Sequence, residues 1–286
     1  MPELLAIGAG YAARPLLMRL AGEGWRVTAT TRDTGKARGL ADEGLTPLVW
    51  AASDPLPADA LARADALLVS VPPRGGCPVL AAMPPGTVRR GARVLYLSAT
   101  SVYGDHGGGW VDEETPARPG TERGRARLAA EAGWRALAEG AGARVTLCRL
   151  AGIYGPGRNA VESLRGDTRG ARAGLAQRVI KPGHVFSRIH RDDIVRGLAA
   201  VLGADAPPGV LNFADDLPCP PQDVIAHAAR LLGRPPPPEV AFADADLSET
   251  ARGFYAENKR VGNAGLRALI GPLTYPTYRE GLAALA

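Results

Sequence analysis

A short apolar run that ends at a glycine constrains this fold more than any other feature of the sequence. Leu4 to Ile7 are apolar, Gly8 follows, and leucines at helical spacing begin soon afterwards. This order predicts a strand, a tight turn and a helix. In the pattern G-x-G-x-x-G/A the first glycine permits the turn, the second admits a pyrophosphate, and the small third residue lets the helix pack closely. The simpler alternative is a tight strand–helix turn without a ligand. We expect a dinucleotide to bind at the helix N-terminus, through Gly8, Gly10, Tyr11 and Ala13.

Strands and helices alternate through the first half of the chain. Apolar runs predict further strands at 25–31, 45–50, 65–71, 93–97 and 144–150, and helical patterns fall at 36–43, 59–63 and 121–140. Such alternation predicts an α/β fold of the Rossmann type, a doubly wound parallel sheet with helices on both faces. We expect a dinucleotide-binding domain over 1–150, to which later segments at about 177–215 return. Residues 151–286 should form mostly a smaller C-terminal substrate lobe.

The later part of the chain is less regular. A long polar, glycine-rich loop is expected over 98–120, and 155–176 reads as irregular. Such a loop in a compact domain usually has a function. A strand is expected at 184–189 and another at 210–214, and helices are expected at 192–202, 220–232, 246–252 and 275–285.

Composition excludes several classes of function. Hydrophobic residues make up 46% of the 286 residues, which is enough for a large core. The net charge is +5, but the basic residues are scattered, which argues against nucleic-acid binding. No apolar run reaches the roughly 20 residues that a membrane span needs. Three widely spaced cysteines argue against a disulfide framework or a metal site and favour the cytoplasm.

The end of the second strand bears on the choice of cofactor. NAD-binding folds usually carry an acidic residue there, about 20 residues after the turn, to bind the ribose 2′-hydroxyl. This chain has Thr30, Thr31 and Arg32 instead. A hydroxyl with a guanidinium suits a 2′-phosphate, so the sequence favours NADP, although Asp33 leaves NAD open and Arg32 could be an exposed loop charge. Val71 and Pro72, which end the strand at 65–71, are expected to line the cofactor.

Four further motifs follow strands or open helices, at 97–105, 149–157, 189–194 and Asn212. Together with the N-terminal turn they resemble the extended short-chain dehydrogenase/reductases. The likeness is nearest to their atypical branch, the NAD-dependent epimerase/dehydratase-like proteins, and it spans nearly the whole chain. The resemblance implies a Tyr-x-x-x-Lys pair for acid/base chemistry and ribose binding. It also implies a Ser or Thr after the fifth strand that hydrogen-bonds the substrate.

This chain departs from that pattern. The Tyr position falls on Arg123, the Lys position on Arg127, and the Ser/Thr position on Ala99. A guanidinium with a pKa above about 12 cannot exchange protons near neutrality, but it can bind an anion. The remaining candidate proton donor is Tyr103, which usually has a packing role in this family. Ser98 and Thr100 are candidate hydrogen-bonding groups beside it.

Other polar residues allow two interpretations. His190 is expected to be a hydrogen-bonded histidine at the end of a strand, and Asp192 and Asp193 are expected to begin a helix. The resemblance places Arg149, Arg158 and Arg188 in segments that line the substrate cleft of relatives. They are therefore candidates for holding an anionic substrate.

Two functions remain open from the sequence. One is an NAD(P)-dependent oxidoreductase or epimerase that acts on an anionic small molecule with an atypical active site. The other is a non-catalytic or regulatory NADP-binding protein. The missing tyrosine favours the second, whereas the long loop over 98–120 and the turn at 155–157 favour the first. A homodimer is compatible with either function.

Overall fold

The computed structural model describes residues 1–166 and 177–286, and it divides into two compact units. Unit 1 contains Met1–Val102, Thr121–Arg149 and Ile194–Leu211. Unit 2 contains Tyr103–Gly120, the described part of Leu150–Asp193, and Asn212–Ala286. The chain therefore passes between the units several times. None of the helices in the described ranges is long and apolar enough to cross a membrane.

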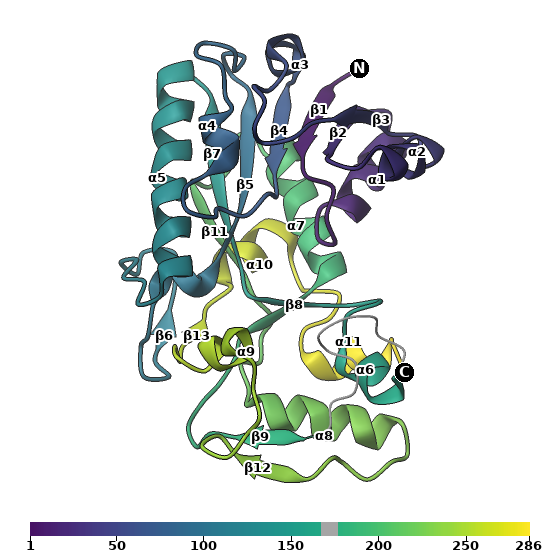
Figure 1. Ribbon diagram of the computed structural model, residues 1–286, viewed down its shortest axis with the longest axis vertical. Helices are drawn as coiled ribbons and strands as arrows, with labels where there is room; N and C mark the ends of the chain where they lie inside the picture. Colours follow the sequence, from purple (N-terminus) through teal and green to yellow (C-terminus); the bar gives the residue numbers. More distant parts are fainter. Residues whose placement is uncertain (167–176) are drawn as a thin grey trace. The chain divides into compact units, whose positions relative to one another are not determined.

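A seven-stranded sheet organises unit 1, in the order β11-β7-β5-β4-β1-β2-β3 (Figure 1). The last residue of β7 and the last two of β11 fall in unit 2. Neighbouring strands from β3 to β5 pair in parallel. The order reverses between β1 and β4, and ligands bind beyond the carboxyl ends of the strands at such a point. The predicted doubly wound parallel sheet is confirmed. Its strands are β1 (Glu3–Ile7), β2 (Arg26–Thr31), β3 (Thr46–Val49), β4 (Ala66–Val69), β5 (Arg93–Ala99), β7 (Arg144–Leu150) and β11 (Val210–Phe213).

Helices cover this sheet because alternate strand residues are apolar on both of its faces. On one face Leu5, Val69 and Tyr96 share a buried cluster with Leu61 of α3 and Trp134 of α5. Their neighbours in each strand point to the opposite face, as the period of two requires. The helices are α1 (Arg14–Gly22), α2 (Thr34–Asp42), α3 (Ala58–Arg63), α4 (Pro78–Ala81), α5 (Glu122–Ala141) and α7 (Arg191–Gly203), of which α7 starts in unit 2.

Short elements make up unit 2. Three parallel strand pairs occur, namely β8 with β10, β9 with β12, and β6 with β13. The strands are β6 (Trp110–Val111), β8 (Gly152–Tyr154), β9 (Arg178–Ile180), β10 (Arg188–His190), β12 (Glu239–Ala241) and β13 (Arg260–Val261). The helices are α6 (Ala160–Arg165), α8 (Pro221–Leu231), α9 (Glu249–Phe254), α10 (Ala264–Ile270) and α11 (Tyr278–Ala283).

Most differences from the sequence expectations fall in unit 2. The segment 155–176 was expected to be irregular, yet it contains α6, where Asn159 accepts a hydrogen bond from the Glu162 N–H at 2.9 Å and caps the helix. Residues 167–176 lie outside the described residues. The helix expected at 246–252 starts later, because Ser248 is its N-cap. The strand expected at 184–189 is confined to Arg188–His190, and α10 was not expected.

The loop expected over 98–120 is also partly regular. It begins with a 3-10 helix, Thr100–Tyr103, and it contains β6. Asn258 ties this loop to the C-terminal part of the chain, because its carbonyl oxygen accepts hydrogen bonds from the N–H groups of His106 and Gly108, both at 3.0 Å. Backbone groups that sequence reading assigned to a free loop are therefore paired by residues about 150 positions away.

Candidate functional site

Gly8 joins the carboxyl ends of three neighbouring strands, β1, β2 and β4. Its N–H donates to the Thr30 Oγ1 of β2 at 2.8 Å, and its carbonyl oxygen accepts from the Ser70 Oγ, just beyond β4, at 3.0 Å. Its φ is +97°, and a Cβ built there would lie 2.5 Å from the Ser70 Oγ. Only glycine fits this position without strain.

Gly10 has open space in front of it. A Cβ built there meets no described atom within 4 Å. The Gly10 carbonyl accepts from the Ala13 N–H at 3.1 Å and so turns the chain into α1, which has no side-chain cap and no acid in its first turn. The positive end of α1 is thus available to an anion. Tyr11 is half-buried in the same turn, and Ala13 is fully buried. These residues fit the pyrophosphate of a dinucleotide.

The end of β2 fixes Asp33 but leaves Arg32 exposed. The Asp33 Oδ1 accepts from the N–H groups of Gly35 at 2.8 Å and Lys36 at 3.3 Å, so this carboxylate is the N-cap of α2. The Asp33 N–H in turn donates to the Thr31 Oγ1 at 3.2 Å. One oxygen of Asp33, the acid that leaves NAD open as a cofactor, is therefore engaged by its own helix. Arg32 is exposed beside it.

The end of β4 lies against the glycine turn. The Val71 Cγ2 would be 3.2 Å from a Cβ at Gly8, and Pro72 follows on the surface. The structure therefore brings together Gly8 and Val71, two of the predicted cofactor residues, at the ends of β1 and β4. Thr30, the neighbour of the predicted Thr31, joins them from β2.

A buried acid lies behind the end of β5. Glu131 of α5 is 2% exposed, and its Oε1 accepts from the Ser98 Oγ at 2.6 Å. Arg149 of β7 donates to both carboxylate oxygens of Glu131, from Nε at 3.2 Å and from Nη2 at 2.8 Å. Arg149, a candidate for substrate binding, thus forms a buried ion pair with α5. Ser98 is engaged in the same network.

Arg127 is buried at the same end of α5. Its Nη1 donates to the Leu97 carbonyl at 3.1 Å. Burial lowers the pKa of Arg127, and the charge of Arg123, one turn earlier, acts in the same direction. The phenol of Tyr96 lies beside Arg127, and burial raises the pKa of Tyr96. The two arginines therefore share a face of the helix, with Arg123 exposed and Arg127 beneath it.

Tyr103 is fully buried in unit 2. Its hydroxyl donates to the Asn212 Oδ1 at 2.7 Å. This geometry favours the packing role over proton exchange with a substrate, because the phenol proton already has a buried acceptor. Thr100 is half-buried in the 3-10 helix of unit 1. Tyr103 and Thr100 are therefore assigned to different units, and the role of each in catalysis stays a prediction.

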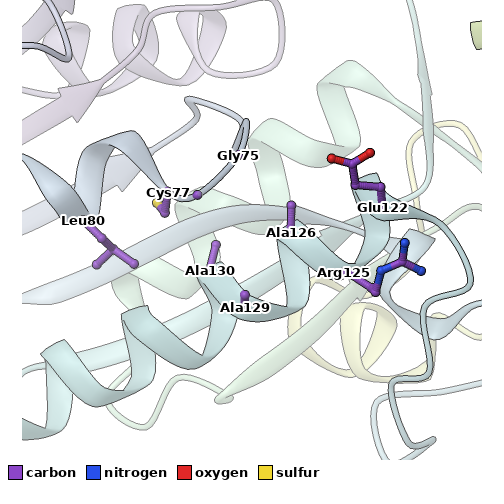
Figure 2. Close-up of a pocket in the computed structure, with 9 residues that line it drawn as sticks. Gly75, Cys77, Leu80, Glu122, Arg125, Ala126, Ala129 and Ala130 are labelled. Atoms are coloured by element: carbon purple, nitrogen blue, oxygen red, sulfur yellow. The ribbon is translucent and has the colours of Figure 1, made fainter.

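A pocket in unit 1 lies between α5 and the loop before α4, with a volume of about 450 Å³ (Figure 2). Leu80 lies toward one end of it, and Glu122 and Arg125 lie toward the other. None of the predicted site residues lines this pocket. The sequence signal for it was weak, because its walls are mostly small residues: Gly75, Gly76, Cys77, Ala126, Ala129 and Ala130.

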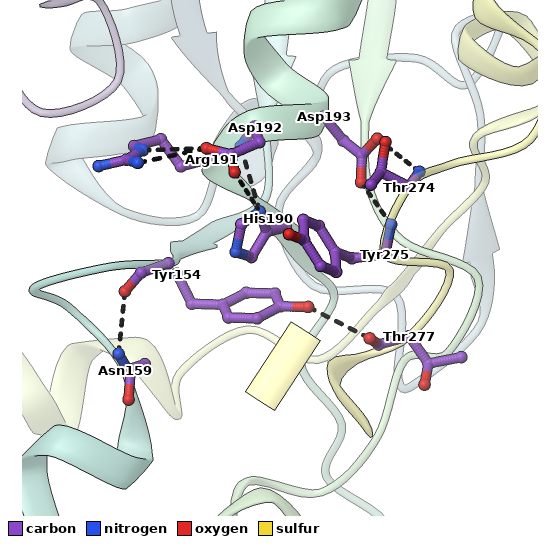
Figure 3. Close-up of polar contacts among 10 residues, drawn as sticks. Tyr154, Asn159, His190, Arg191, Asp192, Asp193, Thr274, Tyr275 and Thr277 are labelled. Carbon is purple, nitrogen blue, oxygen red and sulfur yellow. Dashed lines mark hydrogen bonds and ion pairs between the residues drawn. The ribbon is translucent and has the colours of Figure 1, made fainter. Parts of the chain in front are cut away.

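His190 packs inside unit 2 (Figure 3). It is buried, its ring centroid lies 3.9 Å from that of Tyr275, and its Nδ1 accepts from the Asp192 N–H at 3.2 Å. Burial lowers the pKa of His190, which keeps the ring neutral. Asp193 accepts from the N–H groups of Thr274 at 2.8 Å and Tyr275 at 2.9 Å. His190 is therefore a hydrogen-bonded histidine at the end of β10, as expected, and Asp193 holds a distant loop.

No metal centre is evident in the part of the chain that the structure describes. Residues 1–166 and 177–286 contain no group of three or more His, Cys, Asp or Glu side chains that could hold an ion. Sequence reading missed three buried polar residues, namely Tyr96, Glu131 and Asp215. Only Glu131 had a local signal, as the acid four residues after Arg127.

Comparison with known proteins supports one family. Residues 71–214 match the family model described as the NAD-dependent epimerase/dehydratase family. The protein YeeZ of Escherichia coli (strain K12) is 32% identical over 254 residues, which cover 83% of this chain and 86% of YeeZ. The chain belongs to the NAD-dependent epimerase/dehydratase family.

Solved structures agree in fold. A functionally unknown conserved protein from Silicibacter pomeroyi is 44% identical, with a TM-score of 0.86 and coverage of 100% of this chain and 98% of that one. MoeE5 in complex with UDP-glucuronic acid and NAD is 22% identical, with a TM-score of 0.75 and coverage of 98% and 96%. UDP-glucuronic acid 4-epimerase from Bacillus cereus in complex with NAD is 15% identical, with a TM-score of 0.74 and coverage of 99% and 94%. The last two likenesses concern the fold alone.

The buried pair of Glu131 and Arg149 gives a direct test of what holds α5 on the sheet. Replacing Glu131 by Leu leaves the Arg149 charge buried without its partner, so we expect the free energy of unfolding to fall by about 3–5 kcal/mol. The double variant Glu131→Leu with Arg149→Met should recover most of that loss. Urea denaturation of both variants measures the effect.

The control for this experiment is Glu23→Leu, which removes the acid of an exposed pair with Arg19. It should change the free energy of unfolding by no more than about 1 kcal/mol. A small effect of Glu131→Leu, or a double variant as unstable as the single one, would show that the pair does not anchor the helix.

Proposed function

We propose that this protein is an NAD(P)-dependent oxidoreductase or epimerase that acts on an anionic small molecule without the Tyr-x-x-x-Lys pair. The observation that carries the proposal is the positive helix face formed by Arg123 and Arg127. These residues stand where the resemblance implies Tyr and Lys, and one guanidinium is exposed. Two fixed positive charges favour a carboxylate or phosphate ligand. Relatives in fold bind UDP-glucuronic acid or UDP-glucose together with NAD, which supports a nucleotide-sugar-like substrate.

In this proposal the glycine turn holds the cofactor. Gly10 and the start of α1 would bind the pyrophosphate, Val71 and Pro72 would line the adenosine end, and Thr31 with Arg32 would contact the ribose. The bound nicotinamide supplies hydride chemistry. Arg127 would contribute positive charge beneath the ligand, because its own hydrogen bond is to the Leu97 carbonyl.

Proton transfer needs a group other than the arginines. We propose Tyr103, with Ser98 and Thr100 as hydrogen-bonding groups, although the Tyr103 hydroxyl would have to leave Asn212 to act. The alternative function is non-catalytic or regulatory NADP binding. The observation that favours it is the commitment of Ser98 to Glu131 and of Tyr103 to Asn212.

The role of the glycine turn can be tested at Gly10. The variant Gly10→Val should fold normally, since a Cβ there meets no described atom within 4 Å, but its side chain should occupy the pyrophosphate site. We expect binding of NAD and NADP to be abolished in calorimetry. The control Gly22→Val lies at the other end of α1 and also meets no atom within 4 Å, so it should bind normally. Unchanged affinity in Gly10→Val would refute the assignment.

The preference for NADP depends on Arg32. One charge-assisted contact to the 2′-phosphate contributes about 1.5–3 kcal/mol, which is roughly tenfold to a hundredfold in affinity. Arg32→Ala should therefore weaken NADP binding by that factor and leave NAD binding nearly unchanged. The control Arg38→Ala removes an exposed arginine of α2 and should affect neither. Equal affinity of the unaltered protein for NAD and NADP would overturn the preference.

The altered helix separates the two candidate functions. The double variant Arg123→Tyr with Arg127→Lys restores the pair that the resemblance implies. If the unaltered protein reduces members of a panel of carbonyl compounds, the enzyme proposal holds, and Tyr103→Phe should then change its pH–rate profile. If only the double variant gains turnover, the natural chain is a dinucleotide-binding protein without reductase activity. Measuring NAD(P)H oxidation by absorbance decides between these outcomes for reductase activity.

A further inference from the structure

Two ionisable side chains of unit 2 lie close together, Arg188 at the start of β10 and Asp215 just after the end of β11. The Asp215 N–H donates to the Arg188 carbonyl at 2.6 Å, which holds the two backbones side by side. Asp215 is 1% exposed, and its Oδ1 accepts from the Leu217 N–H at 3.2 Å. Its Oδ2 is buried and has no hydrogen-bond partner among the described residues. A buried polar atom without a partner is uncommon and calls for an explanation.

Arg188 is only half-buried, and its guanidinium is hydrogen-bonded through one nitrogen, Nη1. Its Nη1 donates to the carbonyl oxygens of Phe186 at 2.9 Å and Cys219 at 3.2 Å. Its stem lies over Gly152 of β8, where an added Cβ would be 3.7 Å from the Arg188 Cγ. Within the described residues, its Nη2 and Nε make no hydrogen bond or ion pair. A guanidinium held by one nitrogen presents the others in a fixed direction.

The carboxyl of Asp215 is a donor at neutral pH. Burial raises its pKa to about 8, although the Arg188 charge opposes this shift. Arg188 and Asp215 form no ion pair within the described residues, although the charge of Arg188 acts on the carboxyl of Asp215. Two acids, Asp216 of its own loop and Glu280 of α11, also act on Asp215, and neither supplies a positive charge. The titratable side chains of Tyr154 in β8 and of Cys219 lie close enough for the charge of Asp215 to raise the pKa of each.

We propose that Arg188 and Asp215 form a binding site for the carboxylate of a small anionic substrate. Arg188 supplies the positive charge at the more exposed side, and the protonated carboxyl of Asp215 donates a hydrogen bond from the floor. Both groups are donors and Arg188 is charged, so the site favours a negatively charged acceptor such as a carboxylate over a neutral hydroxyl. This site narrows the substrate of the proposed function to small molecules with a carboxylate. The inference rests on the proposed function.

The site can be observed directly in the full-length protein by NMR. Sodium D-glucuronate is the probe, with D-glucose and inorganic phosphate as comparisons. We expect glucuronate to shift the Arg188 Nε–Hε signal and the Asp215 Cγ signal and to raise the pKa of Asp215. Glucose and phosphate should leave both signals in place. Because deprotonation of Asp215 removes the donor, glucuronate affinity should fall by at least about tenfold between pH 6.5 and pH 9.5.

Two variants and a control sharpen this test. Asp215→Asn keeps a neutral hydrogen-bond donor, so it should bind glucuronate with an affinity that no longer depends on pH. Arg188→Gln should lose at least about tenfold in affinity at both pH values, since its charge is gone. Arg279→Gln removes an exposed arginine of α11 and should behave as the unaltered protein.

Several results would overturn the site. They are the absence of any shift with glucuronate, equal shifts with glucose or phosphate, or unchanged pH dependence in Asp215→Asn. Calorimetry with NAD and NADP, and the assay of NAD(P)H oxidation, are independent of these signals. Failure of those two measurements counts against the proposed function and leaves the carboxylate site standing.

Discussion

The backbone at Gly8 is the constraint on which the sheet of unit 1 depends. Its N–H is fixed by Thr30 of β2 and its carbonyl by Ser70 beyond β4, so one residue holds together the ends of the three strands at the reversal point. The positive φ and the closeness of the Ser70 Oγ exclude a side chain. Gly10, two residues later, has no such contacts. The first glycine is therefore needed by the fold, whereas the second is free to serve a ligand.

The helix α5 likewise has one residue that the fold needs and others that the proposed function assigns to a ligand. Glu131 faces the sheet and is paired with Arg149 and Ser98, so it binds the helix to β5 and β7. One turn earlier Arg127 is also buried, and a further turn back Arg123 reaches the surface. The first turns of α5 thus carry these two arginines beside the acid Glu122, at the end where the helix dipole favours anions. We therefore propose anion binding, and not proton transfer, for this end of the helix.

The sequence predicted unit 1 far better than unit 2. In unit 1 the strands are long, apolar and separated by helices, so periodicity alone identified them and the glycine turn between β1 and α1. Unit 2 is built from strands of two or three residues, such as β6 and β13, whose pairing joins segments about 150 residues apart. Local patterns carry no information about such pairing. The same reason explains which site residues the sequence predicted. Arg127 was predicted from its position in the helix, whereas Tyr96 and Asp215 are identified only by the hydrogen-bond partners that they have or lack in the fold.

The two buried acids, Glu131 and Asp215, differ in how fully their carboxyl groups are hydrogen-bonded. Glu131 accepts three hydrogen bonds and an opposite charge, which compensates for the cost of removing a carboxylate from water. Asp215 is as deeply buried but accepts one backbone hydrogen bond on one oxygen. We propose that a ligand supplies the missing partner of Asp215, so that the unpaired acid, and not the paired one, contacts the substrate.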